Sequence, residues 1–397
     1  MTPMRRRDLR VLFIPTANSG VGYYRLWTWA VAAHRNQAMM VECLWFKYSA
    51  TETAAWEVDI VDPQFRPRIM GELNAKVRQA DVVVMGMAHT PAALNLFLSI
   101  KEAYPHIPVL AEIDDNMLST ADYNPAAAFY GPGSQFRDVA VQQFRAADAM
   151  VVSTPYLKEV YGDLNENVHV VQNSLDFKIW DRLKKIQRPG QIRIGWAGGA
   201  SHSEDLRIIE PIVKRILSKH RNVMFVFVHG APEFLKNTPR VECVSKFSRI
   251  DKYPGFLAGR GFDIGMAPLV DNAFNRGKSN LRWLEYAGMR VPCVASNVGH
   301  FKETLSHGET ALLADTVDEF ESALDLLITD RAMRSRIGNN AYERARRDFN
   351  TDINVFEYEK ILRAVVEKGQ VNKIEQPEYA QPLAVHEQRI SSPEVIS

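Results

Sequence analysis

The segment from Phe262 to Gly299 constrains the fold of this chain more than any other. It begins with a short apolar run over 262–268, continues through a polar loop over 270–277 and a helical pattern, and ends in a second apolar run over 291–295. Short continuous apolar runs are typical of strands that are buried on both faces of a parallel sheet. The order strand, loop, helix, strand therefore predicts an α/β fold, in which ligands bind at the carboxyl ends of the strands.

The start of the predicted helix has the chemistry of an anion site. Lys278 and Ser279 stand at a helix start, where backbone N–H groups are free and the helix dipole is positive. Glu285 follows about two turns later, and its carboxylate can accept hydrogen bonds from two neighbouring hydroxyls of a sugar. Together these residues indicate a phosphorylated sugar ligand. The alternative is that Ser279 only caps the helix and that Glu285 is a solvated surface residue.

The run LEYAGMRVPCVASNVGHFKE, which continues into HGETALLA, resembles the C-terminal signature of glycosyltransferase family 4, a family of retaining enzymes with the GT-B fold. Glu285 matches the second glutamate of that signature, which holds the donor ribose. The first glutamate falls at position 277, where this chain has Gly277. The polar residues around it are therefore assigned to the donor: Asn275, Arg276, Lys278 and Ser279.

The resemblance implies two doubly wound Rossmann-like domains that face a cleft, and a nucleotide-diphosphate sugar as co-substrate with no other cofactor. It spans roughly residues 9–350. The element FN-x-GKS resembles a divergent branch of the family with bacteriophage and bacterial members. Enzymes with the GT-B fold usually need no bound metal, so no metal site is expected.

Domain boundaries follow from the pattern of strands and helices. The charged run KKIQRPGQ is predicted to be a linker because it contains Pro189 and Gly190. The sequence therefore predicts an N-terminal, acceptor-side domain over 1–187 and a C-terminal, nucleotide-sugar-binding domain over 188–350. A last helix over 351–369 is expected to cross back to the first domain. The polar segment over 370–397 has three prolines and is expected to be disordered.

Loops after two predicted strands could approach a diphosphate. Gly20 and Gly22 follow the first strand, and Arg25 stands where a dinucleotide fingerprint would have its third glycine, which argues against NAD binding. Arg25 could meet the diphosphate or could be a surface residue of the first helix. In the second domain, Gly199 and His202 follow a strand and could present backbone N–H groups to the same ligand. Alternatively, Ser203 simply caps the next helix.

Three carboxylates end the strand predicted over 108–113, namely Glu112, Asp114 and Asp115. Clustered acids are electrostatically costly unless a ligand uses them. They could bind sugar hydroxyls, serve as a general base or hold a metal, and the first two uses are favoured. They could also be residues of a turn. His89 ends another strand, where it could contact the donor sugar or be structural.

Composition is ordinary for a two-domain globular protein, with 397 residues and 46% hydrophobic content. The net charge of +1 gives no general attraction to nucleic acid or membranes. Three widely spaced cysteines argue against a disulfide framework. The apolar run near the N-terminus is far too short for a signal peptide or a transmembrane segment. A cytoplasmic protein is therefore expected.

These observations predict a retaining glycosyltransferase that moves a sugar from a nucleotide diphosphate to an acceptor hydroxyl. The residues assigned to the sugar and the acceptor are His89, Asp114 and Asp115. The acceptor is left open among a glycan, a small molecule and a modified DNA base, the last suggested by the bacteriophage resemblance. A second alternative is a catalytically inactive GT-B module that binds a sugar nucleotide or a partner protein.

Overall fold

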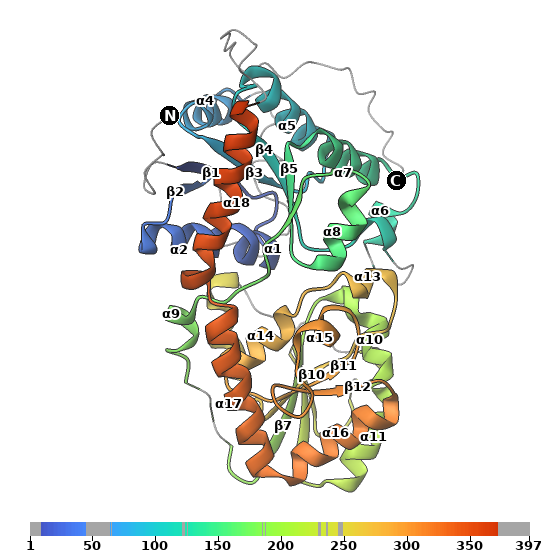
Figure 1. Ribbon diagram of the computed structural model, residues 1–397. Coiled ribbons are helices and arrows are strands. Elements are labelled where there is room, and N and C mark those ends of the chain that lie inside the picture. Colours follow the sequence, from blue (N-terminus) through green and yellow to red (C-terminus); the bar gives the residue numbers. More distant parts are fainter. Residues whose placement is uncertain are drawn as a thin grey trace.

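The computed structural model describes residues 9–44, 64, 66–120, 124, 126–184, 186, 188–228, 232–235, 237–244 and 249–371. It has two α/β domains, one above the other in Figure 1, each built on a six-stranded parallel sheet. The N-terminal sheet has the order β2 (Met40–Cys43), β1 (Arg10–Ile14), β3 (Val82–Gly86), β4 (Val109–Ile113), β5 (Ala149–Val152) and β6 (Val168–Val170). The C-terminal sheet has the order β12 (Leu312–Ala314), β11 (Cys293–Ser296), β10 (Ile264–Ala267), β7 (Ile192–Ala197), β8 (Val223–Val228) and β9 (Val241–Val244).

Helices connect the strands within each domain. Those of the N-terminal domain are α1 (Gly20–Gly22), the π-helix η2 (Tyr23–Trp27), α2 (Thr28–Asn36), α4 (Arg66–Val77), α5 (Pro91–Ala103), η3 (Met117–Ser119), α6 (Ala127–Tyr130), α7 (Gln135–Ala146) and α8 (Pro155–Gly162). The short helix α9 (Phe177–Trp180) follows β6, and its Phe177 and Trp180 pack in the core of the C-terminal domain. Those of the C-terminal domain are η4 (Ala200–His202), α10 (Ser203–Ile208), α11 (Glu210–Lys219), η5 (Glu233–Leu235), η6 (Ile250–Lys252), α12 (Tyr253–Ala258), α13 (Ala273–Arg276), α14 (Leu281–Gly288), α15 (Gly299–Thr304), α16 (Val317–Thr329) and α17 (Arg331–Asp348).

The central strands have the composition that two-sided burial requires. Every residue of β3 (VVVMG) and β4 (VLAEI) is buried, and the two strands pair in parallel with Val83 opposite Val109. Branched apolar side chains fit this environment, because helices cover both faces of the sheet. The one charged residue in this pair is Glu112, which therefore needs a partner inside the protein.

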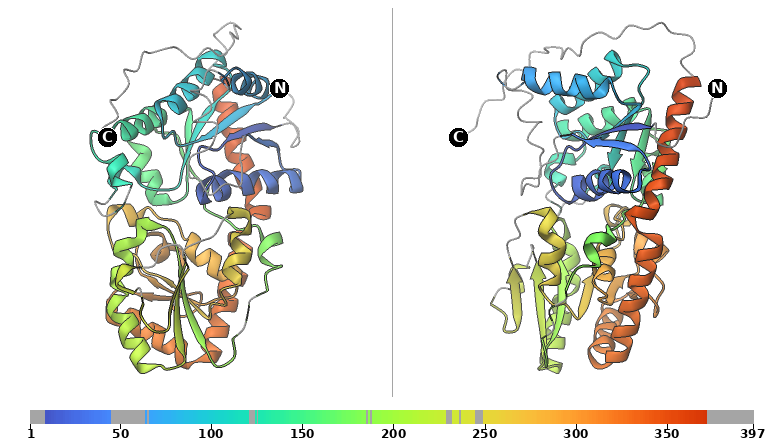
Figure 2. Two further views of the ribbon diagram at one scale, coloured as in Figure 1. Left: turned by 180° about the vertical axis from the view of Figure 1, so that it is seen from behind. Right: turned by 90° about the vertical axis from the view of Figure 1, so that its left-hand side faces the viewer.

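The last helix, α18 (Thr351–Val371), follows α17 of the C-terminal domain, and Figure 2 shows it running along one side of the N-terminal domain. Its buried residues Val355, Tyr358 and Leu362 join the core formed by β1 and α2. The domain boundary predicted at 187/188 falls between β6 and β7. Most of the segment over 370–397 lies outside the described residues.

Two predicted helices differ from the structure. The single helix expected after Ser203 is divided at Ile209 into α10 and α11. Pro211 explains the break, because it has no N–H to donate to the preceding turn. The helix expected from Lys278 begins at Leu281 instead, and a short helix, α13, lies within the loop before it. Lys278 and Ser279 therefore precede the first helical turn and do not belong to it.

Among the described residues, no helix is both long and apolar enough to cross a membrane. The three cysteines, Cys43, Cys243 and Cys293, all lie among these residues, and none of them forms a disulfide.

Candidate functional site between the two domains

A cavity of about 150 Å³ lies between the domains, at the carboxyl ends of β4, β7 and β10. The N-terminal domain contributes two carboxylates, and the C-terminal domain contributes cations, aromatic rings and apolar walls. The lining residues are Asp114, Asp115, Trp196, His202, Ala267, Pro268, Leu269, Lys278, Ser279, Leu281, Arg282 and Phe301. Five residues predicted from the sequence are thus brought together here: Asp114, Asp115, His202, Lys278 and Ser279.

Two cations line the wall formed by the start of α14. The Lys278 Nζ lies 3.3 Å from Asp115 Oδ1 and 4.5 Å from the centre of the Phe274 ring. Arg282 donates through Nη1 to Glu285 Oε2 at 2.8 Å, while its guanidinium lies 5.9 Å from the Trp196 ring centre. Sequence reasoning missed Arg282. Its position four residues after Lys278 was the available signal, because a helix beginning at Lys278, as predicted, would place both side chains on one face.

The backbone at this wall also favours an anion. Asn280 is the N-cap of α14, but its side chain makes no capping hydrogen bond. Leu281 N donates to Ser279 Oγ over a long 3.4 Å. The N–H groups of the first turn thus add their partial positive charge to that of Lys278 and Arg282. This wall can hold an anion such as a diphosphate.

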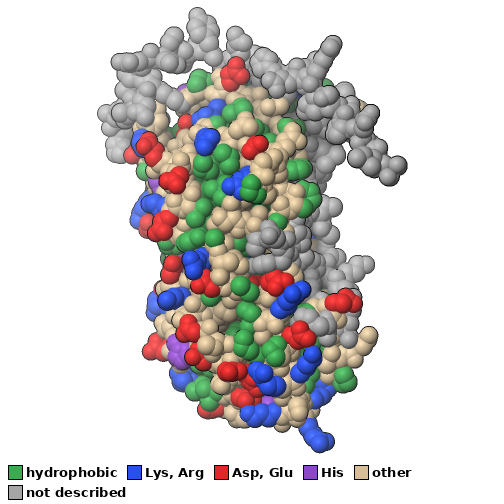
Figure 3. Space-filling view, turned by 90° about the vertical axis from the view of Figure 1, so that its right-hand side faces the viewer, with side chains coloured by type: hydrophobic (Ala, Val, Ile, Leu, Met, Phe, Trp, Pro, Cys, Tyr) green, Lys and Arg blue, Asp and Glu red, His purple; other side chains and the backbone are tan. Residues whose placement is uncertain are grey.

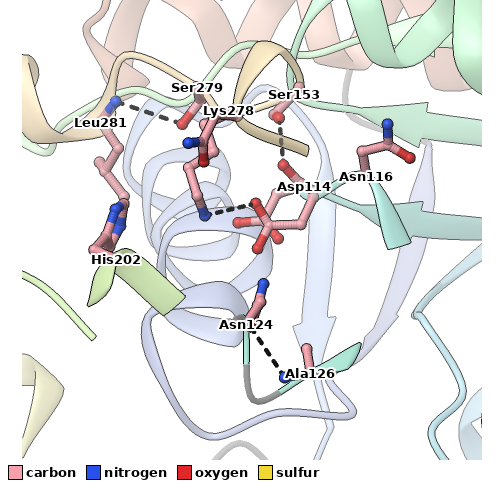
Figure 4. A network of polar contacts seen from close by, with 12 residues as sticks. Asp114, Asn116, Asn124, Ala126, Ser153, His202, Lys278, Ser279 and Leu281 are labelled. Carbon is pink, nitrogen blue, oxygen red and sulfur yellow. Dashed lines mark hydrogen bonds and ion pairs between the residues drawn. The ribbon is translucent and has the colours of Figure 1, made fainter. Parts of the chain in front are cut away.

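Two carboxylates face the cations across the cavity. Asp114 and Asp115 follow β4, and Figure 4 shows Asp114 opposite Lys278. Burial, and then the charges of Asp115 and Glu112, raise the pKa of Asp114 to about 8. At neutral pH Asp114 therefore carries a proton for much of the time, and it can both donate and accept hydrogen bonds.

Arg25 departs from its predicted role at the diphosphate. The side chain is 1% exposed, and its Nε donates to Glu112 Oε1 at 2.6 Å. Nη1 donates to Val171 O at 2.6 Å and to Asn173 Oδ1 at 3.0 Å. Arg25 thus neutralises the buried carboxylate of β4 and does not line the cavity, although its buried Nη2 has no hydrogen-bond partner among the described residues. Gly20 and Gly22, which form α1 just before it, do not line the cavity either.

Glu285 also differs from the prediction that it binds a ribose. It is 3% exposed and accepts hydrogen bonds from Tyr24 OH at 3.1 Å, Tyr253 OH at 3.5 Å and Arg282 Nη1 at 2.8 Å. These three donors leave little capacity for ligand hydroxyls. Because Tyr24 belongs to the other domain, Glu285 connects the domains and holds Arg282 at the cavity wall.

The loop after β7 contributes His202 but not Gly199 to the cavity. His202 Nδ1 lies 2.7 Å from Asp205 Oδ2, and burial lowers the pKa of His202 despite this partner. Asp205 also accepts from Asn275 Nδ2 at 2.7 Å. Asn275 is completely buried, so it holds this loop in place and does not contact a nucleotide-sugar donor.

Arg276 and His89 are placed away from the cavity lining. Arg276 Nε pairs with Asp271 Oδ1 at 2.6 Å on the surface. His89 Nδ1 lies 2.6 Å from Tyr130 OH, and burial lowers the pKa of His89 to about 4. The imidazole is therefore neutral at pH 7, and its predicted contact with the sugar stays a prediction.

Gly277 allows the two domains to approach each other closely. A Cβ at this position would lie 2.9 Å from Leu157 Cδ2 and 3.1 Å from Asn116 Cβ, both in the N-terminal domain. Thr154 Oγ1 donates to Gly277 O at 3.3 Å, and Asn116 Nδ2 donates to Ala273 O at 3.0 Å. A glutamate at position 277 would not fit this arrangement.

Comparisons with known proteins agree with this architecture. Residues 228–359 match a family model described as Glycosyl transferase-like. No curated protein matches the chain.

Three solved structures show the same fold. Anabaena HepE, solved with UDP and glucose, is 13% identical over 90% of this chain and 100% of its own, with a TM-score of 0.61. The sucrose-phosphate synthase of Thermosynechococcus elongatus is 12% identical over 90% of this chain and 100% of its own, with a TM-score of 0.62. The UDP-forming trehalose-phosphate synthase of Burkholderia xenovorans is 11% identical over 90% and 99%, with a TM-score of 0.59. This chain therefore has the two-domain GT-B fold that the sequence predicts.

Proposed function

We propose that this protein transfers a sugar from a nucleoside-diphosphate sugar to an acceptor hydroxyl. The observation that carries the proposal is the pairing of two cations, Lys278 and Arg282, with the start of α14 at one wall of the interdomain cavity. The match of residues 228–359 to a glycosyl transferase-like model supports it.

The proposed role of the cationic wall is to hold the diphosphate and to stabilise it as it leaves. In the reaction, the bond between the sugar C1 and the β-phosphate oxygen breaks, and a bond from C1 to the acceptor oxygen forms. Negative charge then grows on the departing diphosphate, whose oxygen takes up the proton that the acceptor hydroxyl loses. Preorganised cations and N–H groups at that point stabilise the charge without further reorganisation.

For the donor we propose a UDP-sugar and for the stereochemistry retention. HepE has been solved with UDP-glucose, which makes the uridine nucleotide the first one to test. Retention follows from the resemblance of the run around Glu285 to family 4. The anomeric configuration of the first product, read by NMR before it can equilibrate, tests the stereochemistry.

For the acceptor we favour a glycan or a small molecule over duplex DNA. A DNA acceptor requires a basic groove, whereas acidic and basic side chains are interspersed on the described part of the face shown in Figure 3. The net charge of +1 points the same way. A salt-sensitive mobility shift of duplex DNA would argue for DNA instead.

The first experiment is calorimetric titration with UDP, GDP, ADP and CDP. We expect one nucleotide to bind, and we expect Lys278→Ala to weaken it by about ten- to a hundredfold, as expected for losing a charge-assisted hydrogen bond. Lys214→Ala, on the exposed side of α11, is the matched control and should bind as the wild type does. If no nucleotide binds, the proposal fails.

A second measurement separates an enzyme from an inactive sugar-nucleotide-binding module. Slow release of nucleoside diphosphate from the sugar conjugate, lost in Lys278→Ala, is the result expected of a transferase that uses water as a poor acceptor. Binding of the conjugate with no release, even with a broad panel of acceptors, would favour the inactive module.

A further inference from the structure

Asn124 has a buried amide nitrogen to which no other described residue offers a hydrogen-bond acceptor. The residue is 3% exposed, and its Oδ1 accepts a hydrogen bond from Ala126 N at 3.0 Å. Its Nδ2 makes no hydrogen bond within the ranges that the structure describes. Figure 4 shows this nitrogen pointing toward the end of β4, where Asp114 lies. Leaving a buried donor unsatisfied costs free energy, so an acceptor from a ligand would be stabilising there.

Asp114 offers the complementary group. Its carboxyl lines the cavity, and within the described part of the chain no hydrogen bond to that carboxyl is formed. At the backbone of the same residue, Ser153 Oγ donates to Asp114 O at 3.0 Å. Asn124 and Asp114 do not bond to each other. Asn124 does not itself line the cavity, but its amide N–H points toward the carboxyl of Asp114, which does, so a ligand group beside Asp114 would meet a donor and an acceptor together.

The position of Lys278 indicates which part of a nucleotide-sugar donor would lie beside Asp114. Asp115, next in sequence to Asp114, lies 3.3 Å from the Lys278 Nζ. If Lys278 holds the β-phosphate, the group bonded directly to that phosphate is the sugar, and it extends past Lys278 toward β4. The sugar's hydroxyls would then lie beside Asp114 and Asn124.

We propose that Asp114 and Asn124 form a subsite that binds hydroxyl groups of the transferred sugar, so that the substrate class is a nucleotide sugar with unsubstituted neighbouring hydroxyls. This inference rests on the proposed function. A hydroxyl donates and accepts at once, so it matches an amide N–H on one side and a carboxyl on the other. A protonated Asp114 also fits, because it can donate to a second hydroxyl.

The opposite wall explains why this task belongs to the N-terminal domain. Position 277 cannot supply a carboxylate, because a side chain there would collide with Leu157 and Asn116. Sugar recognition by Asp114 therefore depends on the two domains being closed, since the diphosphate wall lies on the other domain. Binding the sugar and closing the cleft become one event.

The test compares the dissociation constants of UDP and UDP-glucose, or of the corresponding pair for whichever nucleotide binds, in the wild type, Asp114→Ala and Asn124→Ala. We expect the wild type to bind the sugar conjugate more tightly than the nucleotide. Each variant should reduce that preference by about tenfold, the value of one hydrogen bond to a charged or buried group, while its affinity for the nucleotide itself is retained. Asp318→Asn, on the exposed side of α16, is the control.

Each other outcome has a definite meaning. If the nucleotide binds but the preference for the conjugate is absent in the wild type or unchanged in both variants, the subsite proposal is overturned while the proposed function stands. If no nucleoside diphosphate binds at all, the proposed function fails and the subsite proposal falls with it. Retained nucleotide binding shows that a variant is folded. If one of the two variants fails to fold, the other still tests the subsite.

Discussion

Gly277→Ala gives a sharp test of how the two domains meet. The backbone at Gly277 has φ of −77° and ψ of −17°, which alanine adopts without strain. Judged from the local conformation alone, the change should stabilise the protein by about 0.4–1 kcal/mol, because alanine restricts the unfolded chain. The tertiary structure predicts the opposite sign.

The magnitude follows from the distances at the domain interface. The new Cβ would lie 2.9 Å from Leu157 Cδ2, 3.1 Å from Asn116 Cβ and 3.3 Å from Phe274 O. The Leu157 methyl can rotate away, but Asn116 is held by its bond to Ala273 O. Overpacking of this kind costs about 1–3 kcal/mol. Since 1.4 kcal/mol corresponds to a factor of ten, the closed arrangement should be disfavoured by about five- to a hundredfold.

The assay combines small-angle X-ray scattering with donor affinity. We expect a larger radius of gyration and a weaker dissociation constant for the nucleotide sugar in Gly277→Ala. Leu157→Ala in the same chain should relieve part of the effect by removing the nearest atom. Gly71→Ala is the matched control: it lies in α4 with no atom within 4 Å of a new Cβ, so it should stabilise the protein slightly.

The reasoning would be refuted if wild type and Gly277→Ala had the same radius of gyration and the same dissociation constant for the nucleotide sugar. It would also be refuted if Gly277→Ala lost affinity and Leu157→Ala did not restore any of it. In either case the close approach at Gly277 would not govern closure.

Three further predictions concern the groups around the cavity. Burial and neighbouring acids raise the pKa of Asp114 from its ordinary value to about 8, so the folded state binds more protons than the unfolded state. The free energy of unfolding should therefore fall as pH rises from about 4 to 8. Asp114→Asn should flatten this pH dependence and raise the melting temperature at pH 8 by several degrees, as measured by calorimetry. Arg25→Met should cost about 3–5 kcal/mol in denaturant unfolding because it leaves Glu112 charged and buried, and adding Glu112→Leu should recover more than half of that loss. Tyr24→Phe should weaken donor binding about tenfold with little change in unfolding free energy, because it removes the interdomain hydrogen bond to Glu285; an unchanged dissociation constant would show that this bond does not assist closure.

Much of the fold could be predicted because its signals are local. The buried runs of β3, β4 and β10 are each a few residues long, and the turn residues that end them are adjacent in sequence. The carboxyl ends of parallel strands lie at one edge of a sheet, so the loops carrying Asp114 and Lys278 could be placed at a shared cleft. Even where the helices differ from the prediction, as at the break beside Pro211, the cause is local in sequence.

The pairing of charges could not be predicted in the same way. The sequence pattern assigns Arg25 and Glu285 to the ligand, because a cation and a carboxylate near a cleft suit phosphate and ribose. In the structure each is instead held by protein groups far away in sequence, with Glu112 standing 87 positions after Arg25 and Tyr24 standing 261 positions before Glu285. Arg282, which sequence reasoning passed over, is held toward the cavity by Glu285.

The sequence by itself thus determined two parallel α/β domains and the loops that meet between them, because periodicity and turn chemistry act over a few residues. Only the tertiary structure decided which polar groups are neutralised inside the protein and which, like Lys278 and Asp114, are left facing the cavity. The physical reason is that a buried charge must find its counterpart wherever the fold provides one. That counterpart is set by which distant segments pack together, which no local pattern records.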